Sequence, residues 1–372
     1  MENKFFLRLR LLAFAFLPFV LTAQSRKDRH LSSAEVLGVR ADASVASAAP
    51  VQKLDTASIR RMGVTSTADA LRRFAGVNLR DYGGAGGLKT VSVRGLGAQH
   101  TAVVYDGVTV SNAQQGQIDL GRFSLDRLAG VELHTADEGN LLVPVRQLGA
   151  ATVVLRSWQP NAQNQGMHGA VALRHGSFGV WNPSLLLSQN WNGHTAVNVS
   201  ADYYHGNNAY PFTVKNGVAT HREKRLNSQM NDWTLEANVH HLLRRGQLSG
   251  KVFYVTNHRY LPGPVTLYVS GNNEHLTEQN AFAQLRWEQQ YGRWNFFGAG
   301  KADWRESKYL DIAGRYPGGR LDQRYKQGEI YASAGASYAW QALTAAVATD
   351  WFRNGLTSNL KVDNDVWRTS WL

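Results

Sequence analysis

Apolar and polar residues alternate with a period of two along much of the chain beyond residue 165. In "NDWTLEANVHHL", residues 231–242, Trp233 and Leu235 fall on one face, whereas Glu236 and Asn238 fall on the other. Successive side chains of a strand point to opposite faces, so this pattern predicts β-strands. It predicts a strand beginning near Val366 and nine before it, at 169–176, 182–190, 195–206, 230–242, 247–258, 279–290, 294–306, 328–340 and 342–352.

The predicted strands are long, and the connections between them alternate in length. Most strands have about 9 to 13 residues, whereas soluble strands usually have about 5–6 and a tilted membrane strand needs about 9–11. Short connections such as 191–194 and 244–246 alternate with long ones at 207–229, 259–278 and 307–327. Short turns on one side and long loops on the other are typical of an outer-membrane β-barrel. Alternation alone also allows a soluble β-sandwich, which is the alternative fold.

Aromatic residues divide the chain into two regions. All 11 Trp residues lie at or after Trp158, and only Tyr82 and Tyr105 of the 14 Tyr residues precede it. We therefore place a domain boundary near 158–167, between a small glycine-rich region and a strand-rich region. Aromatic girdles are typical of membrane barrels, and the tryptophans that we predict near strand ends are Trp191, Trp233, Trp294, Trp304, Trp340 and Trp351.

The first 23 residues are predicted to be a secretory signal peptide. Lys4, Arg8 and Arg10 precede the apolar run "LLAFAFLPFVLTA", which ends at the small residue Ala23. This run is too short to span a membrane as a helix, and no later segment has about 18 consecutive apolar residues. The mature chain is therefore either soluble outside the inner membrane or crosses a membrane as a β-barrel.

The residue types argue against several kinds of chemistry. The chain has no cysteine, which excludes disulfides and thiolate sites. Its formal net charge is +12, but the basic residues are spread out, which argues against nucleic acid as a partner. The adjacent His240 and His241 would point to opposite faces of a strand and could not bind one metal ion. We find no nucleophile elbow, metal-ligand spacing or persuasive carboxylate pair, so we expect no enzyme, no catalytic residue and no metal site.

The stretch "LKTVSVRGLGAQHTAVVYDGVTV", residues 88–110, contains a glycine-rich hinge. Gly95 and Gly97 suggest a dinucleotide-binding loop, but the third glycine is replaced by His100. An apolar strand follows instead of a helix, and phosphate binding needs the N-terminus of a helix. The dinucleotide interpretation is therefore rejected.

We interpret the same stretch as strand, hinge and strand. Val91 and Val93 alternate into a core, and the hinge at 95–97 permits a tight turn. Residues 103–105 then return as a second strand, and Asp106-Gly107 gives another turn.

The stretch resembles the centre of the plug domain of TonB-dependent outer-membrane receptors. In that family one strand ends in Arg-Gly and the next ends in Asp-Gly-Val; the matching residues here are Arg94, Gly95, Asp106 and Gly107. Residues 66–81, "STADALRRFAGVNLRD", resemble the plug helix and the Gly-Val that follows it. Ser66 or Thr67 would cap this helix, and Leu71 and Phe74 would point inward. Residues 118–133 and 147–157 resemble later plug strands.

The resemblance implies a fold class and a location. We expect a small N-terminal α+β plug domain at 51–158 and the N-terminal part of a transmembrane β-barrel at 159–372, in the cell outer membrane. Such barrels have about 22 strands, so the barrel is expected to be partial and the chain to be a fragment or a truncated form of a larger receptor. Residues 134–151 lack the family's usual Ala-Leu-Tyr-Gly run, and we expect a divergent, Bacteroidetes-like subgroup.

The resemblance also implies energised transport of a scarce, bulky nutrient. The partner would be the periplasmic TonB protein with its inner-membrane energising complex, which captures an extended segment by adding it to a sheet edge. The candidate for this TonB box lies in the flexible segment 24–50 and consists of Glu35, Val36, Leu37, Gly38 and Val39. Outer-membrane lipid and an extracellular small molecule are the other expected partners.

The ligand is expected to bind between the plug apex and the extracellular loops. The apex candidates are polar or small loop residues: Tyr82, Gly83, Gly84, Gln99, His100, Asn112, Gln114, Gln115 and Gln117. Loop segments 207–212, 258–264 and 315–320 could add stacking and ionic contacts. The ligand class stays open among siderophore, cobalamin, haem and glycan, and a haem-binding pair of His100 with a loop histidine is one option. No protein-bound cofactor is expected.

Two other classes of function compete with the receptor. One is a passive pore or a truncated, non-transporting remnant, which would not depend on residues 35–39. The other is a secreted carbohydrate-binding β-sandwich, which would be soluble in water.

Overall fold

The computed structural model describes residues 51–64, 66–82, 88–112, 116–135, 142–158, 165–263, 272–312, 314, 316–341, 343–360 and 364–371. The predicted signal peptide, the segment 24–50 and the TonB box within it lie outside the described residues. Of the helices in the described part of the chain, none is long and apolar enough to cross a membrane.

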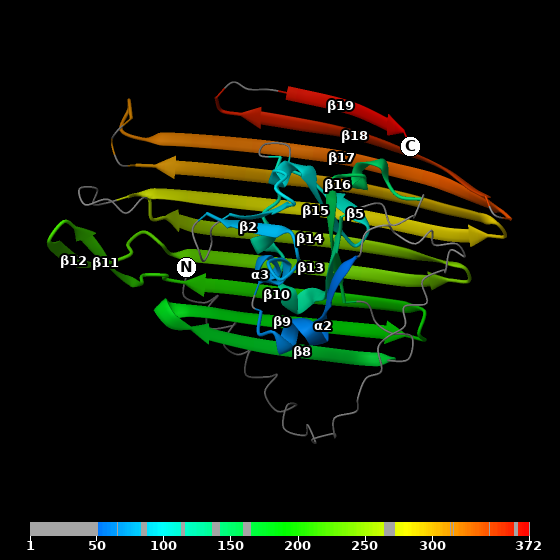
Figure 1. The fold of residues 1–372 in the computed structure, drawn as a ribbon, viewed down its shortest axis with the longest axis horizontal. Coiled ribbons are helices and arrows are strands. Elements are labelled where there is room, and N and C mark those ends of the chain that lie inside the picture. Colours follow the sequence, from blue (N-terminus) through cyan, green and yellow to red (C-terminus); the bar gives the residue numbers. More distant parts are fainter. Residues whose placement is uncertain are drawn as a thin grey trace, which may run out of the picture. The chain divides into compact units, whose positions relative to one another are not determined.

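Residues 52–157 form two small sheets joined by short helices, here called the plug (Figure 1). A five-stranded sheet has the order β1-β6-β7-β4-β5, and β2 pairs with β3 separately. Strands β4 and β7 run parallel, whereas the other pairs are antiparallel. The elements are β1 (Gln52–Asp55), α2 (Thr56–Arg61), α3 (Thr67–Leu71), β2 (Val77–Asp81), β3 (Lys89–Val93), η2 (Ala98–His100), β4 (Thr101–Tyr105), β5 (Val108–Val110), η3 (Leu120–Arg122), η4 (Leu125–Arg127), β6 (Leu128–His134), η5 (Val145–Gln147) and β7 (Ala151–Ser157).

The predicted plug helix is confirmed, although it is short. Ser66 caps α3, because its side chain accepts a hydrogen bond from Asp69 N and so satisfies a donor that the helix leaves free. Leu71 and Phe74 are both buried, as the sequence predicts. Helix α3 is thereby fixed at its N-terminus and along its apolar side.

The strand–hinge–strand interpretation of residues 88–110 is correct for the two strands but wrong for their pairing. Strand β3 pairs with β2, whereas β4 pairs with β5 and β7. The hinge therefore connects two different sheets. Val91 and Val93 are buried as expected, because the two sheets share one apolar core.

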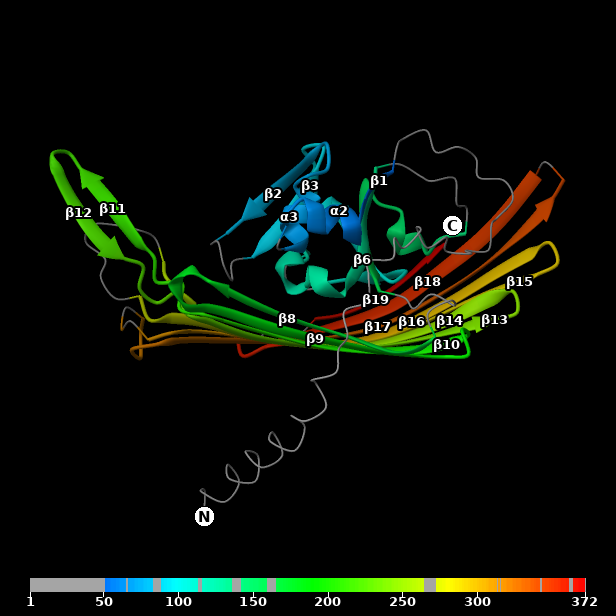
Figure 2. The ribbon, with the colours of Figure 1, turned by 90° about the horizontal axis from the view of Figure 1, so that it is seen from below.

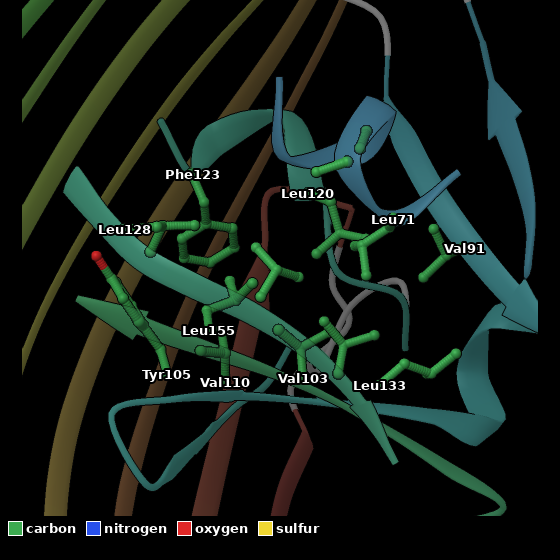
Figure 3. Close-up of a cluster of buried hydrophobic side chains, with 14 of the residues drawn as sticks. Leu71, Val91, Val103, Tyr105, Val110, Leu120, Phe123, Leu128, Leu133 and Leu155 are labelled. Atoms are coloured by element: carbon green, nitrogen blue, oxygen red, sulfur yellow. The ribbon is translucent and has the colours of Figure 1, made fainter. Parts of the chain in front are cut away.

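The plug core is aliphatic apart from a few aromatic rings. Figure 3 shows Leu71 and Leu120 from helices, Leu133 and Leu155 from the five-stranded sheet and Val91 from β3 converging on one cluster. Tyr105 lies at the edge of this cluster, with its hydroxyl directed away from the aliphatic side chains (Figure 3). This hydroxyl is the first link between the plug and the larger sheet.

The second region is a ten-stranded antiparallel sheet whose strands are neighbours in chain order (Figure 1). All nine predicted strands and the tenth are present. They are β8 (Gly166–Gly176), β9 (Val180–Trp191), β10 (Thr195–Gly206), β13 (Met230–Leu243), β14 (Gly246–Leu261), β15 (Glu274–Tyr291), β16 (Trp294–Asp311), β17 (Leu321–Trp340), β18 (Leu343–Ser358) and β19 (Asn364–Trp371).

Several strands extend further into the long loops than predicted. Strands β15, β16 and β17 have 18, 18 and 20 residues, well above the roughly 9–11 that cross a bilayer. Residues 258–261, expected in a loop, belong to β14. The long connection 207–229 contains a hairpin of β11 (Pro211–Asn216) and β12 (Ala219–Lys224), with Gly217-Val218 as its two-residue turn.

Burial in the ten-stranded sheet is the reverse of burial in the plug. One face, here called the outer face, carries exposed apolar residues such as Leu235, Leu285 and Ile330. The opposite inner face carries buried charged residues such as Glu236 and Lys301. Figure 2 shows the plug elements over one face of this sheet, and hydrogen bonds to plug residues identify that face as the inner one. The sheet therefore presents apolar residues to lipid, as a membrane barrel does.

The tryptophans predicted at strand ends are only partly at these ends. Trp191, Trp294 and Trp340 are the first or last residues of their strands, at the short turns. Trp233 lies near the start of β13. Trp304 and Trp351 lie inside β16 and β18 because these strands continue beyond the predicted limits.

Candidate functional site

The Asp106-Gly107 motif forms a two-residue hairpin turn between β4 and β5. Both residues have left-handed backbones, with φ of 47° and 80°, which is the geometry that favours Asp-Gly at such turns. A Cβ at Gly107 would also lie 2.7 Å from Arg286 Cδ in β15, so the Arg286 side chain would have to move and its hydrogen bond to Gly107 O would be disturbed. The motif is thus required both by the turn and by the contact with the larger sheet.

The Asp106 carboxylate connects the plug sheet to the ten-stranded sheet. It accepts hydrogen bonds from Ser157 N at 2.8 Å and Ser157 Oγ at 2.6 Å. Lys251 Nζ in β14 lies 2.9 Å from Asp106 Oδ2 and 2.5 Å from Glu236 Oε1. Tyr105 donates its hydroxyl to Glu236 Oε2 at 2.6 Å. Four consecutive links therefore join β7, β4, β14 and β13.

Burial and charge act in opposite directions on the pKa of Asp106. Burial raises the pKa of this carboxyl, but the nearby Lys251 ammonium and the hydrogen bonds from Ser157 outweigh burial and lower it. Burial, together with the Glu236 charge, raises the pKa of Tyr105 well above its usual value. Asp106 is therefore held ionised and Tyr105 is held as a hydrogen-bond donor.

A second ionic cluster joins η3 to strands β14 and β15. Arg122 Nη2 lies 2.7 Å from Glu278 Oε1, and Arg259 Nη2 lies 2.7 Å from Glu278 Oε2. Asp119 Oδ2 stands 3.6 Å from both guanidinium groups. The plug and the ten-stranded sheet thus each contribute one carboxylate and one arginine to this cluster, and each carboxylate lies near both arginines.

A third cluster joins η5 and β5 to strands β16 to β18. Arg146 Nη2 lies 2.9 Å from Glu329 Oε2, and Arg146 N donates to Asp350 at 2.8 Å. Lys301 Nζ bonds Glu329 at 2.7 Å and Thr109 O at 2.9 Å. The plug is therefore attached to the inner face by charged groups at three separate places.

Between the plug and strands β8 to β14 lies a polar cavity of about 450 Å³. Its lining includes Arg122 and Arg127 from the plug and Asp202 and Asp232 from the sheet. In the part of the chain that the structure describes, Arg122 Nε, Asp202 Oδ2 and Asp232 Oδ1 are buried atoms without a hydrogen-bond partner. A polar cavity with such atoms suits water or the polar groups of a bound molecule.

The structure separates the predicted apex residues. Tyr82 N bonds Leu88 O at one end of the β2–β3 hairpin, whereas Arg94 N bonds Gly76 O at the other end. Gln99 and His100 follow that second end and are exposed, so they do not lie with Tyr82.

Two further apex candidates, Asn112 and Gln117, lie between β5 and η3. Asn112 accepts a hydrogen bond from Gln327 in β17. Gln117 comes two residues before Asp119, whose side chain accepts a hydrogen bond from Lys89 N at 3.1 Å. Gly83, Gly84, Gln114 and Gln115 lie outside the described residues. Gln117 thus lies near Tyr82, Asn112 lies against β17, and Gln99 and His100 lie at η2.

The predicted loop residues also need correction. Arg259, which was expected in a ligand-binding loop, is a buried inner-face residue of β14 paired with Glu278. Among the described residues no group of three or more His, Asp or Glu side chains is arranged to hold a metal ion.

Sequence reasoning missed the ionic clusters on the inner face. The alternation places Glu236 on the polar face of its strand, but a polar face alone predicts contact with water. The signal that could have found the clusters is charge: Lys251, Glu278, Lys301 and Glu329 recur on the same face of successive strands.

A small α+β plug held by polar contacts against the inner face of an antiparallel membrane sheet defines the class of plugged outer-membrane β-barrels. Residues 44–144 match the family model described as the TonB-dependent Receptor Plug Domain. This region of the chain is therefore a TonB-dependent receptor plug domain, and the location of the chain is the outer membrane.

Solved structures share the fold at low sequence identity. The siderophore receptor PirA from Acinetobacter baumannii is 12% identical with a TM-score of 0.61, and the match covers 82% of this chain and 48% of that chain. The ferripyoverdine receptor of the outer membrane of Pseudomonas aeruginosa is 14% identical with a TM-score of 0.58, covering 86% and 44%. The copper transporter OprC is 12% identical with a TM-score of 0.59, covering 82% and 46%.

The chain thus spans less than half the length of these solved structures. The ten-stranded sheet corresponds to part of their barrels, and the α+β plug precedes it in this chain.

Proposed function

We propose that the receptor containing this chain takes up a scarce, bulky nutrient across the outer membrane, driven by TonB. The observation that carries the proposal is the chemistry of the plug's attachment to the inner face. Charged and polar groups form this contact at three places. Buried ion pairs contribute little net stability, because desolvation offsets their attraction. Water can replace the charged partners of the plug, so a plug attached by polar contacts can be released. An apolar contact between plug and sheet could not be released in this way.

TonB would pull on residues 35–39 after capturing them as an added strand. The force would reach the plug through the segment that leads into β1, and the polar cavity beside Arg122 and Arg127 offers a place where water is already able to enter. Support for a passage at this place comes from the unpartnered polar atoms that face the cavity.

We propose a ferric siderophore as the first ligand class to test. Two of the similar solved structures are described as a siderophore receptor and a ferripyoverdine receptor. The copper transporter has a comparable TM-score, so copper is the second ligand to test. Tyr82, Gln117 and Asn112 are the ligand contacts that we propose, because Gln117 lies near Tyr82 and Asn112 contacts the inner face of the sheet at Gln327.

The experiment measures uptake of ⁵⁵Fe chelated by hydroxamate, catecholate or pyoverdine siderophores in iron-starved cells. Deletion of residues 35–39 should abolish uptake without lowering the amount of receptor in the outer membrane. A matched control removes residues 43–47 from the neighbouring Ala/Ser stretch and should retain uptake. Uptake that persists after deletion of 35–39 would instead support a passive pore, and no uptake of any iron chelate would reject the siderophore class.

A further inference from the structure

The outer face of the ten-stranded sheet contains an apolar groove of about 570 Å³. Small residues of three strands line it: Ala281 and Ala283 in β15, Ala302 in β16 and Gly328 in β17. Larger side chains, including Val252, Trp304 and Ile330, stand around these small residues. We call this feature the outer groove. It differs from the polar cavity because it lies on the face that carries the exposed apolar side chains.

The level of the outer groove in the bilayer follows from β16. Trp294 and Trp304 lie ten residues apart on this strand, and about 3.4 Å per residue at a tilt of about 40° gives a height near 25 Å. This is the height of the apolar band between two aromatic girdles. Trp294 adjoins a short turn and Trp304 lies toward a long loop. The outer groove, which Trp304 borders, therefore lies in the leaflet on the loop side.

Charged residues follow immediately beyond Trp304 on the same face. Glu306 pairs in register with Lys326, and Lys308 pairs with Arg324, so all four side chains share the outer face. Arg324 binds Asp322 at 3.0 Å. For Lys308 and Lys326 the structure gives no carboxylate within ion-pair distance in the described part of the chain.

These charges leave an excess of positive charge above the groove. Lys308, Arg324 and Lys326 face the two carboxylates of Glu306 and Asp322. Three cations therefore stand against two anions. Cationic groups at this level meet the headgroups of lipids, and an anionic headgroup would complement them.

We propose that the outer groove binds an acyl chain of an outer-leaflet lipid whose phosphate is held by Lys308 and Lys326. An apolar groove that faces hydrocarbon is filled by hydrocarbon, since an unfilled groove loses van der Waals contacts. The methyl group of Ala302 and the lack of a side chain at Gly328 allow close approach of a methylene chain. The lysines supply two ammonium groups at the end of the groove where a headgroup would lie. This lipid site goes beyond the proposed uptake function and does not depend on it.

The test is lipid retention by the receptor after extraction from outer membranes in a mild neutral detergent. Phosphorus per receptor is measured, and the retained lipids are identified by mass spectrometry. The unchanged receptor should retain a phosphorylated outer-leaflet lipid. The double variant Lys308→Gln and Lys326→Gln should lower retention about threefold or more by removing the headgroup contacts, and Ala302→Leu should lower it similarly by filling the groove.

Two matched controls separate this site from general effects. Lys215→Gln removes an exposed lysine from the β11–β12 hairpin, and Ala334→Leu enlarges an exposed alanine of β17 that does not line the groove. Both should retain lipid like the unchanged receptor, and heat-modifiable migration checks that every variant is folded. Equal retention by all variants would overturn the proposal, as would retention of inner-leaflet glycerophospholipid alone. Loss of iron uptake with unchanged lipid retention would concern only the proposed function.

Discussion

Apolar and polar residues alternate along the strands of both the plug and the ten-stranded sheet, but the surroundings of the two regions are opposite. In the plug, Leu133 and Leu155 are fully buried. In the sheet, Leu285 is 59% exposed while Lys301 is 4% exposed. The plug has its apolar residues inside because water surrounds it, whereas the sheet has them outside because lipid does. The difference teaches that alternation identifies two faces, and only the surroundings decide which face is the interior.

The largest expected effect comes from removing a cation from the inner face. Lys251→Met leaves Asp106 and Glu236 buried without their shared partner, so we expect the free energy of unfolding to fall by about 3–5 kcal/mol. Urea titration of the receptor in micelles, followed by tryptophan emission and by hydrogen exchange in β4, measures this change.

The matched control is a lysine on the outer face. Lys326→Met removes an exposed charge and should change the free energy of unfolding by less than about 1 kcal/mol. Equal losses for the two lysine variants would show that the inner face is not distinguished by buried charge.

The next effect contrasts two leucines. Leu155→Ala opens a cavity in the plug core, where this residue is fully buried, and should lower the free energy of unfolding by about 3 kcal/mol. Leu285→Ala on the outer face should cost less than about 1 kcal/mol, because lipid chains fill the space. Hydrogen exchange in β7 and in β15 reports each loss separately. A larger loss from Leu285→Ala would reverse the assignment of the two faces.

A smaller effect appears on acidification of the plug. Burial raises the pKa of Glu132, but hydrogen bonds from His134 and Arg156 outweigh it and lower the pKa to about 2. Its contribution to stability is therefore complete above its usual pKa and is lost as pH falls from about 4.5 toward 2. After allowance for solvent screening, we expect a loss on the order of 2 kcal/mol.

The measurement is hydrogen exchange in β6 and β7 at pH 5 and pH 3. Glu132→Gln should be less stable at pH 5 and should lose most of this difference between the two pH values. An unchanged pH dependence in Glu132→Gln would assign the effect to other carboxylates, such as Asp106.

The smallest effect concerns the start of α3. Ser66→Ala removes the hydrogen bond that the Ser66 side chain accepts from Asp69 N, and we expect a loss of about 1 kcal/mol. Ser58→Ala, at a half-buried serine of α2 whose side chain accepts a hydrogen bond from Arg61, is the control and should leave residues 67–77 unaffected. The measurement is hydrogen exchange of the backbone amides in residues 67–77. Equal exchange rates in Ser66→Ala and in the unchanged receptor would show that the cap does not stabilise the plug.

Much of the strand order could be predicted from the sequence, because neighbours in a meander are consecutive and lipid-facing residues recur at every second position. The ends of the strands on the side of the long loops could not be predicted from the sequence. Residues 274–279, "EHLTEQ", continue β15 with polar and charged residues, since this part lies beyond the apolar band. The β11–β12 hairpin was missed although Asn216-Gly217 is a strong local turn signal.

The pairing within the plug was the harder part of the fold. Strand β4 pairs with β7, about fifty residues further along the chain, and no local pattern specifies that partner. For the candidate site, the motif Asp106-Gly107 could be found from the sequence because its turn is local. Its partners Lys251 and Glu236 could not, because they depend on how two regions fit together.

The links between plug and sheet also have a consequence for the order of assembly. Tyr105 and Glu236 are 131 residues apart, Arg122 and Glu278 are 156 apart, and Arg146 and Asp350 are 204 apart. A chain exported from its N-terminus delivers the plug long before these strands arrive. During that interval the unpaired charges of the plug remain hydrated, which keeps it dissolved and free of aggregation. The charged groups that later join the plug to the sheet thus also keep the plug soluble before the sheet has formed.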